Sequence, residues 1–171
     1  MRIAALPFII TKSTDAYSIK EYTSTTETAH GLLRVDDEHL VIQWRLKRTT
    51  DRMGVGYSSE ESLEPIREVS IALTQLASAT LRRPWWLIGR GPRLVLTATE
   101  LRAFEGVAGP TGLALAHPSQ LELQLHRRDA DLGREFAVEL ELAISEHQLR
   151  VAEGSDQPRL DGGEGAAASD R

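Results

Sequence analysis

The sequence predicts a mainly β protein with one C-terminal α-helix, in which the helix caps a seven-stranded antiparallel barrel or sandwich. Apolar and polar residues alternate with a period of two in several short segments between residues 29 and 128, as in half-buried strands. Beyond residue 128 the apolar spacing changes to four, which indicates a single amphipathic helix. A run of strands followed by one helix argues against βαβ crossovers and a parallel sheet.

The composition is that of an ordinary globular domain, with 171 residues, 41% hydrophobic and 26% charged. One domain with a hydrophobic core is expected at this length. The net charge of −5 argues against a protein that coats nucleic acid, so nucleic acid is not expected as a partner. The absence of cysteine excludes disulfides, thiolate metal sites and cysteine nucleophiles.

Residues 1–27 are predicted to form an N-terminal strand or arm that precedes the main domain. The apolar run from Ile3 to Ile10 is at the short end for a signal peptide, and no A-x-A-like cleavage site follows it. No apolar run approaches the roughly 18 residues that span a bilayer. A cytoplasmic protein is therefore expected.

The main domain, predicted over residues 28–148, opens with an antiparallel hairpin. Residues 39–47 alternate strictly, and the predicted core face consists of Leu40, Ile42, Trp44 and Leu46. Residues 29–35 are the predicted partner strand, because the polar turn formers Asp36, Asp37 and Glu38 lie between the two segments. Residues 48–65 carry two glycines, a proline and several serines, and they are predicted to form a long loop.

Five further strands complete the predicted sheet. Pro84 places an edge or a bulge in the fourth strand, because proline cannot donate a ladder hydrogen bond. Glycines and prolines between the segments provide the turns. The five predicted strands cover residues 67–74, 77–88, 93–99, 100–107 and 120–128.

A helix follows, with one apolar face made by Leu132, Phe136, Leu140 and Ile144. Asp129 or Asp131 can cap its start. Gly133 costs about 1 kcal/mol relative to alanine in a helix, which indicates a packing reason for a glycine there. The helix is predicted to end near His147, and the glycine-rich polar segment 149–171 is predicted to be a disordered tail.

The order of these pieces resembles a pleckstrin-homology-like domain of the bacterial type over residues 28–146. The resemblance is carried by GLLRVDDEHLVIQWR, REVSIAL with LASATL, LRAFEGVAG, and LELQLHRRDADLGREFAVELE. The positions that match the family's turn and its strand–helix junction are Phe104, Val107, Gly109, Arg127 or Arg128, and Asp129. The resemblance implies a small β scaffold whose open end the helix closes.

Phosphoinositide-binding members of that family place lysines and arginines in the first hairpin loop. Here that loop is Asp36-Asp37-Glu38-His39, and its three carboxylates would repel a polyphosphate headgroup. Phosphoinositide binding is therefore not expected at this hairpin.

The segment LRRPWWLIGRGPR, residues 81–93, is the candidate interaction surface. Adjacent strand residues face opposite sides, so one tryptophan is expected in the core and the other is free for a partner. Arginines on both sides would attract an acidic protein or anionic lipid. The candidate residues are Arg82, Arg83, Trp85, Trp86, Arg90 and Arg93.

No enzyme, cofactor or metal motif is present: the five histidines lack metal-ligand spacing, and there is neither a P-loop nor a G-x-S-x-G elbow. The leading hypothesis is a non-catalytic module that binds a protein or itself through a strand edge or the tryptophan–arginine hairpin. Peripheral binding to anionic lipid through the same hairpin is the alternative, and a small-molecule carrier is the third possibility.

Overall fold

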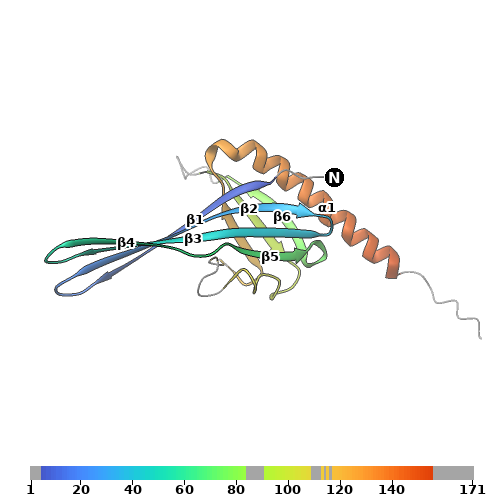
Figure 1. Ribbon diagram of the computed structural model, residues 1–171. Helices are drawn as coiled ribbons and strands as arrows, with labels where there is room; N and C mark the ends of the chain where they lie inside the picture. The colour runs from blue at the N-terminus through green and yellow to red at the C-terminus, as the bar shows by residue number, and fades with distance from the viewer. Residues whose placement is uncertain (1–4, 84–90, 109–112, 114, 116, 156–171) are drawn as a thin grey trace, which may run out of the picture.

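The computed structural model describes residues 5–83, 91–108, 113, 115 and 117–155. All strand pairings in this part of the chain are antiparallel, and one helix follows the strands, so the predicted fold class is confirmed (Figure 1). The strands are β1 (Leu6–Tyr17), β2 (Tyr22–Asp36), β3 (His39–Met53), β4 (Tyr57–Leu63), β5 (Arg67–Ala72), β6 (Leu76–Arg82), β7 (Arg93–Ala98) and β8 (Gln120–Gln124). Two 3₁₀ turns, η1 (Leu73–Gln75) and η2 (Arg127–Asp129), precede β6 and the helix α1 (Ala130–Ser155).

The strand order is β4-β3-β2-β1-β8-β7-β6, and the described strands at its two ends do not pair with each other, so the sheet is open. The strand β3 serves two partners in succession. Its first half pairs with β5 and its second half with β4. The link between β1 and β8 is the single pair Ile9–Gln124.

The core lies between the curved sheet and α1, which packs across β6. The predicted apolar face of the helix is buried at Phe136, Leu140 and Ile144, which are 1%, 0% and 2% exposed. Trp44 is also buried, as the alternation in β3 predicts. The contact of one apolar helix face with the sheet therefore holds the body together.

Gly133 has the packing reason that the sequence indicates. A Cβ atom there would collide with Cδ1 of Leu125, so glycine lets the helix lie against this side chain without displacing it. Polar contacts also join the helix to β6. Oε2 of Glu141 accepts a hydrogen bond from the backbone N–H of Ala79 at 2.6 Å, and Nε2 of Gln148 donates to the carbonyl of Leu76.

The predicted loop at 48–65 is wrong. The strand β3 continues to Met53, a short turn of Gly54 to Gly56 follows, and β4 returns along it. The segment is rich in threonine and serine, and neither of its faces is buried, so it shows no period-two apolar pattern. Backbone pairing extends past the core although side-chain burial does not.

Three other boundaries differ from the prediction. The strand β2 begins at Tyr22, whereas the predicted strand begins at residue 29. Residues 100–107 form successive turns instead of a strand, with Phe104 and Val107 buried as anchors. The helix continues beyond His147 to Ser155, because no helix breaker occurs before Gly154. Part of the predicted fourth strand (84–88) and residues 156–171 of the predicted tail lie outside the described residues.

Candidate interaction surfaces

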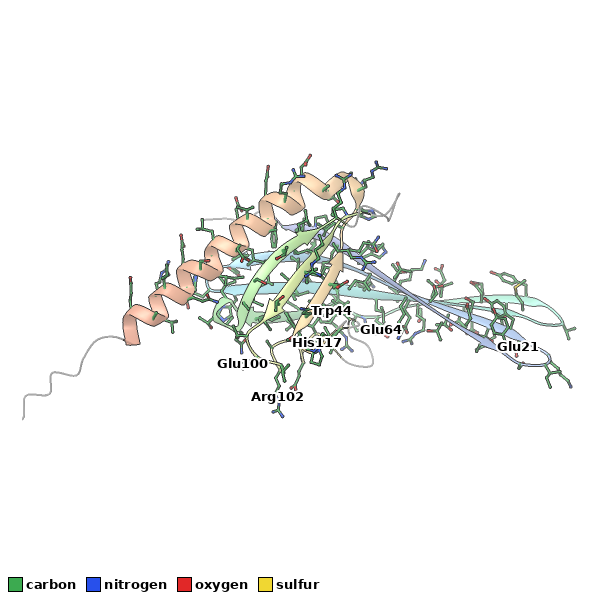
Figure 2. All side chains as sticks on the ribbon, turned by 180° about the vertical axis from the view of Figure 1, so that it is seen from behind. Glu21, Trp44, Glu64, Glu100, Arg102 and His117 are labelled. Carbon is green, nitrogen blue, oxygen red and sulfur yellow. The ribbon has the colours of Figure 1, made fainter. Side chains whose placement is uncertain are left out.

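One surface is a β-arm that consists of residues 11–28 and 47–63 and projects from the body (Figure 1). The paired residues Ile10, Ala29 and Leu46 make the last core row across β1, β2 and β3. Beyond this row the same strands continue with β4 as a fourth strand, and every residue of β4 is exposed. Figure 2 shows Glu64 at the root of the arm and Glu21 at its far end, with side chains standing on both faces.

Both edges of the β-arm are open among the described residues. The N–H of Ser18 donates to the carbonyl of Glu21, so the peptide groups of Ser18 face β2. Because direction alternates along a strand, Thr11, Ser13, Asp15 and Tyr17 direct their peptide groups away from β2. Ile9 is also an odd-numbered residue of β1, and its peptide groups pair with β8 on the side away from β2. The edge of β1 is therefore available to an added strand from Thr11 onward.

Cross-strand ion pairs connect the strands of the arm. Arg48 lies 2.8 Å from Glu27, and Lys47 lies 2.8 Å from Glu61. Pairs this exposed contribute about 0–1 kcal/mol each. Backbone ladders and many such small contacts, without a core, hold the arm together.

All three tyrosines of the chain lie in one row at the far end of the arm. The register pairs Tyr17 with Tyr22, Tyr22 with Met53 and Met53 with Tyr57, so the four side chains share one face. We call them the tyrosine row. Tyr17, Met53 and Tyr57 are 79%, 55% and 68% exposed, and the rings of Tyr17 and Tyr22 are 4.7 Å apart.

The next row inward carries two carboxylates that hold the tyrosine hydroxyls. Tyr22 donates its hydroxyl to Asp15 at 3.0 Å, and Tyr57 donates to Asp51 at 2.9 Å. Hydrogen bonds from Ser59 and Tyr57 lower the pKa of Asp51.

The pKa of Tyr22 shifts the other way. The hydrogen bond with Ser24 acts to lower it, but the bond to Asp15, burial and the charges of Asp15 and Tyr17 outweigh that effect and raise the pKa above 10.0. The ionised form of Asp51 and the neutral form of Tyr22 are therefore both favoured in the folded arm.

The second surface contains the described part of the predicted site. Arg82 and Arg83 are exposed at the end of β6, and Arg93 pairs across to Arg82 and forms an ion pair with Glu122 at 3.2 Å. Trp85, Trp86 and Arg90 lie outside the described residues.

Arg127 and Arg128, one of which the resemblance places at the strand–helix junction, join this surface. The N–H of Leu125 donates to the carbonyl of Pro92, and a Cβ on Gly91 would lie 3.0 Å from the backbone nitrogen of Arg127. We name this surface the arginine corner, and its members are Arg82, Arg83, Arg93, Arg127 and Arg128. The pairing of β7 with β8 brings Arg127 and Arg128 close to Arg82, Arg83 and Arg93. The two groups are far apart in the sequence, so the sequence alone did not predict the corner.

The first hairpin turn carries the opposite charge. Asp37 has a left-handed backbone (φ 50°), and the whole turn is exposed. A hollow of about 330 Å³ separates the turn from α1, where Glu139, Glu146 and His147 line it. Oε1 of Glu38 lies 3.8 Å from Nε2 of His147. Arg150 also lines the hollow and forms an ion pair with Glu146 at 3.9 Å. Among the described helix residues that line it, Glu139 is therefore the carboxylate without a paired cation, and it adds to the repulsion expected for a phosphoinositide.

Within residues 5–83, 91–108, 113, 115 and 117–155, no group of three or more metal-ligating side chains gathers, and no helix is long and apolar enough to span a bilayer. Comparison of the chain with family models, with curated proteins and with solved structures finds no match.

Proposed function

We propose that the protein is a non-catalytic protein-binding module and that the β-arm is the element that holds its partner. One observation carries the proposal: a four-stranded sheet that has no buried residue on either face and is open at both edges among the described residues. Sheets in globular proteins normally bury at least one face, and open edges are normally short, covered or bulged. The arm buries almost nothing against its own body, so its surface is free for a partner.

The edge of β1 supports strand addition as one way to bind. Its outward peptide groups can form a ladder with an extended segment, and such ladders recur in peptide recognition. The edge of β4 is also open, and the exposed Glu60 and Glu61 there disfavour an acidic partner strand.

The test is a shortened arm. Replacing residues 13–26 and residues 49–61 each by Asn-Gly joins Lys12 to Glu27 and Arg48 to Ser62, which are paired in the native ladders. A photo-crosslinking residue at Ser13 or Ser59, introduced in the producing cells, should give discrete adducts. The same residue at Leu142, exposed on α1, is the matched control.

We expect adducts from the arm positions and none from Leu142. The crosslinking residue is then placed at Lys12, which both the full-length and the shortened protein contain. We expect the full-length protein to give an adduct from Lys12 and the shortened protein to give none. Circular dichroism should show that the body of the shortened protein is folded. Adducts of equal yield from Leu142, or an unchanged adduct at Lys12 of the shortened protein, would remove the arm from the proposal.

A second candidate function rests on the arginine corner. In the described part of the chain, no ion pair involves Arg82, Arg83 or Arg127, so their charge is free for an acidic protein or an anionic lipid surface. Sedimentation with vesicles tests the lipid form. Salt-sensitive binding to vesicles with acidic lipid, lost in Arg82→Ala/Arg127→Ala, supports it; equal binding to neutral vesicles contradicts it.

We also propose that the body is a pleckstrin-homology-like scaffold and that the protein works in the cytoplasm. An antiparallel sheet followed directly by one capping helix supports the scaffold. The long arm on β1 to β4 and the open sheet are departures from the compact barrel that the resemblance implies. If Phe136→Asp unfolded at the same urea concentration and as cooperatively as the natural protein, the helix would not cap the sheet and the scaffold proposal would end.

A further inference from the structure

We propose that the tyrosine row is the docking site for a basic segment of a partner protein, whose arginine or lysine side chains lie over the tyrosine rings and pair with Asp15 and Asp51. This inference rests on the proposed function of the arm, because it names which part of the arm binds and what chemistry it selects.

The first step is the shape of the row. Tyr17, Tyr22, Met53 and Tyr57 come from all four strands and share one face, so they form a continuous strip across the arm. Strands are about 4.8 Å apart, which makes the strip about 14 Å wide. Tyrosine and methionine are enriched in protein interfaces, and tyrosine contributes a large contact area at low conformational cost. A strip of this kind suits a protein segment that lies across the strands.

The second step is the way the rings are held. The hydroxyls of Tyr22 and Tyr57 are tied to Asp15 and Asp51, and the Ser24 hydroxyl also donates to Asp15 at 2.8 Å. These bonds restrict the rings before any partner arrives, while Tyr17 and Tyr57 remain mostly exposed. Binding then orders fewer side chains than it would on an untethered surface.

The third step is charge. On this face of the arm the charged residues are Asp15, Asp51, Lys47 and Glu61, and Lys47 forms its ion pair with Glu61 at 2.8 Å. Among the described residues, no ion pair engages Asp15 or Asp51, so the charge left on this face is negative. The Asp51 carboxyl is ionised at neutral pH because its ordinary pKa of 3.8 is far below 7, and its hydrogen bonds lower the pKa further. A basic segment complements it, whereas acidic lipid is repelled.

The fourth step is the combination of ring and carboxylate. A guanidinium or ammonium group over a tyrosine ring gains cation–π attraction, worth about 0.5–1 kcal/mol at an exposed site. Asp15 and Asp51, which accept the hydroxyls of Tyr22 and Tyr57, add a charge partner for the same cation. Arginine, which stacks and hydrogen-bonds at once, is the better fit of the two residues.

The test uses the full-length protein, isotope-labelled, titrated with an Arg-Gly repeat peptide and with a Glu-Gly repeat peptide of equal length. Amide shifts induced by the Arg-Gly peptide should concentrate on residues 15–17, 22–24, 51–53 and 57–59. Two variants, Tyr17→Ala/Tyr57→Ala and Asp15→Asn/Asp51→Asn, should each weaken binding by about tenfold.

The matched control is Glu60→Gln/Glu135→Gln, which removes the same charge from the opposite face of the arm and from the helix. It should bind like the natural protein. An equal loss in the control would mean general attraction to a protein of net charge −5, and this would overturn the proposal. Equal binding of the Glu-Gly peptide would also overturn it.

Analytical sedimentation of the purified protein tests the remaining alternative, in which the tyrosine row binds a second copy of the chain. If the protein alone self-associates and Tyr17→Ala/Tyr57→Ala abolishes this, then the tyrosine row binds the basic arginine corner of a second copy. The proposal that it binds a different protein would then be wrong. A Lys12 adduct in cells that is lost when the arm is shortened but persists in Tyr17→Ala/Tyr57→Ala would leave the arm's function standing and refute the tyrosine row alone.

Discussion

The body and the β-arm are built on the same three strands, yet different forces stabilise them. One row of paired residues, Ile10, Ala29 and Leu46, belongs to the core, and the next row, Thr11, Thr28 and Lys47, lies outside it. The hydrogen-bonding register continues across this boundary without a break. A ladder can therefore extend past the core that nucleates it, and the extension becomes surface available for binding.

The energetic difference follows from burial. Each large side chain buried in the body contributes about 1.5–3 kcal/mol. In the arm each cross-strand pair contributes about 0.2–1 kcal/mol. The predictions that follow test this contrast through matched changes in the two regions.

The largest effect is expected from the helix face. Phe136→Ala removes a ring that is 1% exposed and should lower the free energy of unfolding by about 3–5 kcal/mol. Thr25→Ala in the arm should change it by no more than about 0.5 kcal/mol. Urea denaturation of both variants is the measurement. Comparable losses in the two would mean that the arm contributes to a core.

Two glycines provide the next comparison. At Gly31 an added Cβ would lie 2.2 Å from Cζ of Phe8 and 2.5 Å from the carbonyl oxygen of Gln43, and at Gly56 nothing lies within 4 Å. Gly31→Ala should therefore cost about 1–3 kcal/mol, because the Phe8 ring must move. Gly56→Ala should stay within about 0.5 kcal/mol. Thermal unfolding measures both variants, and the midpoint of Gly31→Ala should be the lower of the two. A reversed order would contradict the packing of Phe8 over Gly31.

A smaller effect is expected from carboxylate contacts. Glu141→Ala leaves the Ala79 N–H without its partner on the helix and should cost about 1–2 kcal/mol. Glu60→Ala removes an exposed arm contact to Arg52 at 3.9 Å and should cost at most about 0.5 kcal/mol. The same urea experiment measures both. If Glu60→Ala proved the more costly, the arm would hold a structural network that its exposure does not indicate.

The sequence predicted the body well for the same reason that the body is stable. Burial of one face imposes a period of two on β3, so Trp44 was placed correctly, and the spacing of four placed Phe136 and Leu140 correctly in α1. The arm has no buried face, and its serines and threonines carry the signal of a loop. Strand pairing without burial leaves no periodic trace in a sequence.

The interaction surfaces were partly predictable. Arg82 and Arg83 could be found as a local cluster, but Arg127 joins them only because β7 and β8 pair. The tyrosine row combines residues up to 40 positions apart, from Tyr17 to Tyr57, through three consecutive registers. The concentration of every tyrosine of the chain in segments with no apolar period was the one signal in the sequence that could have located it.

The smallest effect concerns Asp51 and tests whether the arm is ordered in solution. The hydroxyls of Ser59 and Tyr57 lower the pKa of this carboxyl from 3.8 in the folded arm. A lowered pKa means that the contribution of Asp51 is complete above the unfolded value and is lost as the pH falls through the folded value. The end of the arm should therefore loosen only in acid.

Side-chain NMR titration of Tyr57→Phe should show the pKa of Asp51 raised toward 3.8, because one of its two hydroxyl donors is gone. Tyr22→Phe is the matched control: it removes the hydroxyl that Asp15 accepts and leaves Asp51 with both of its donors. An Asp51 that titrates identically in the natural protein and in Tyr57→Phe would mean that the hydroxyl contact is not maintained in solution. The Tyr57 ring would then lack its tether, and this half of the row would be a mobile polar ribbon and not a preorganised surface.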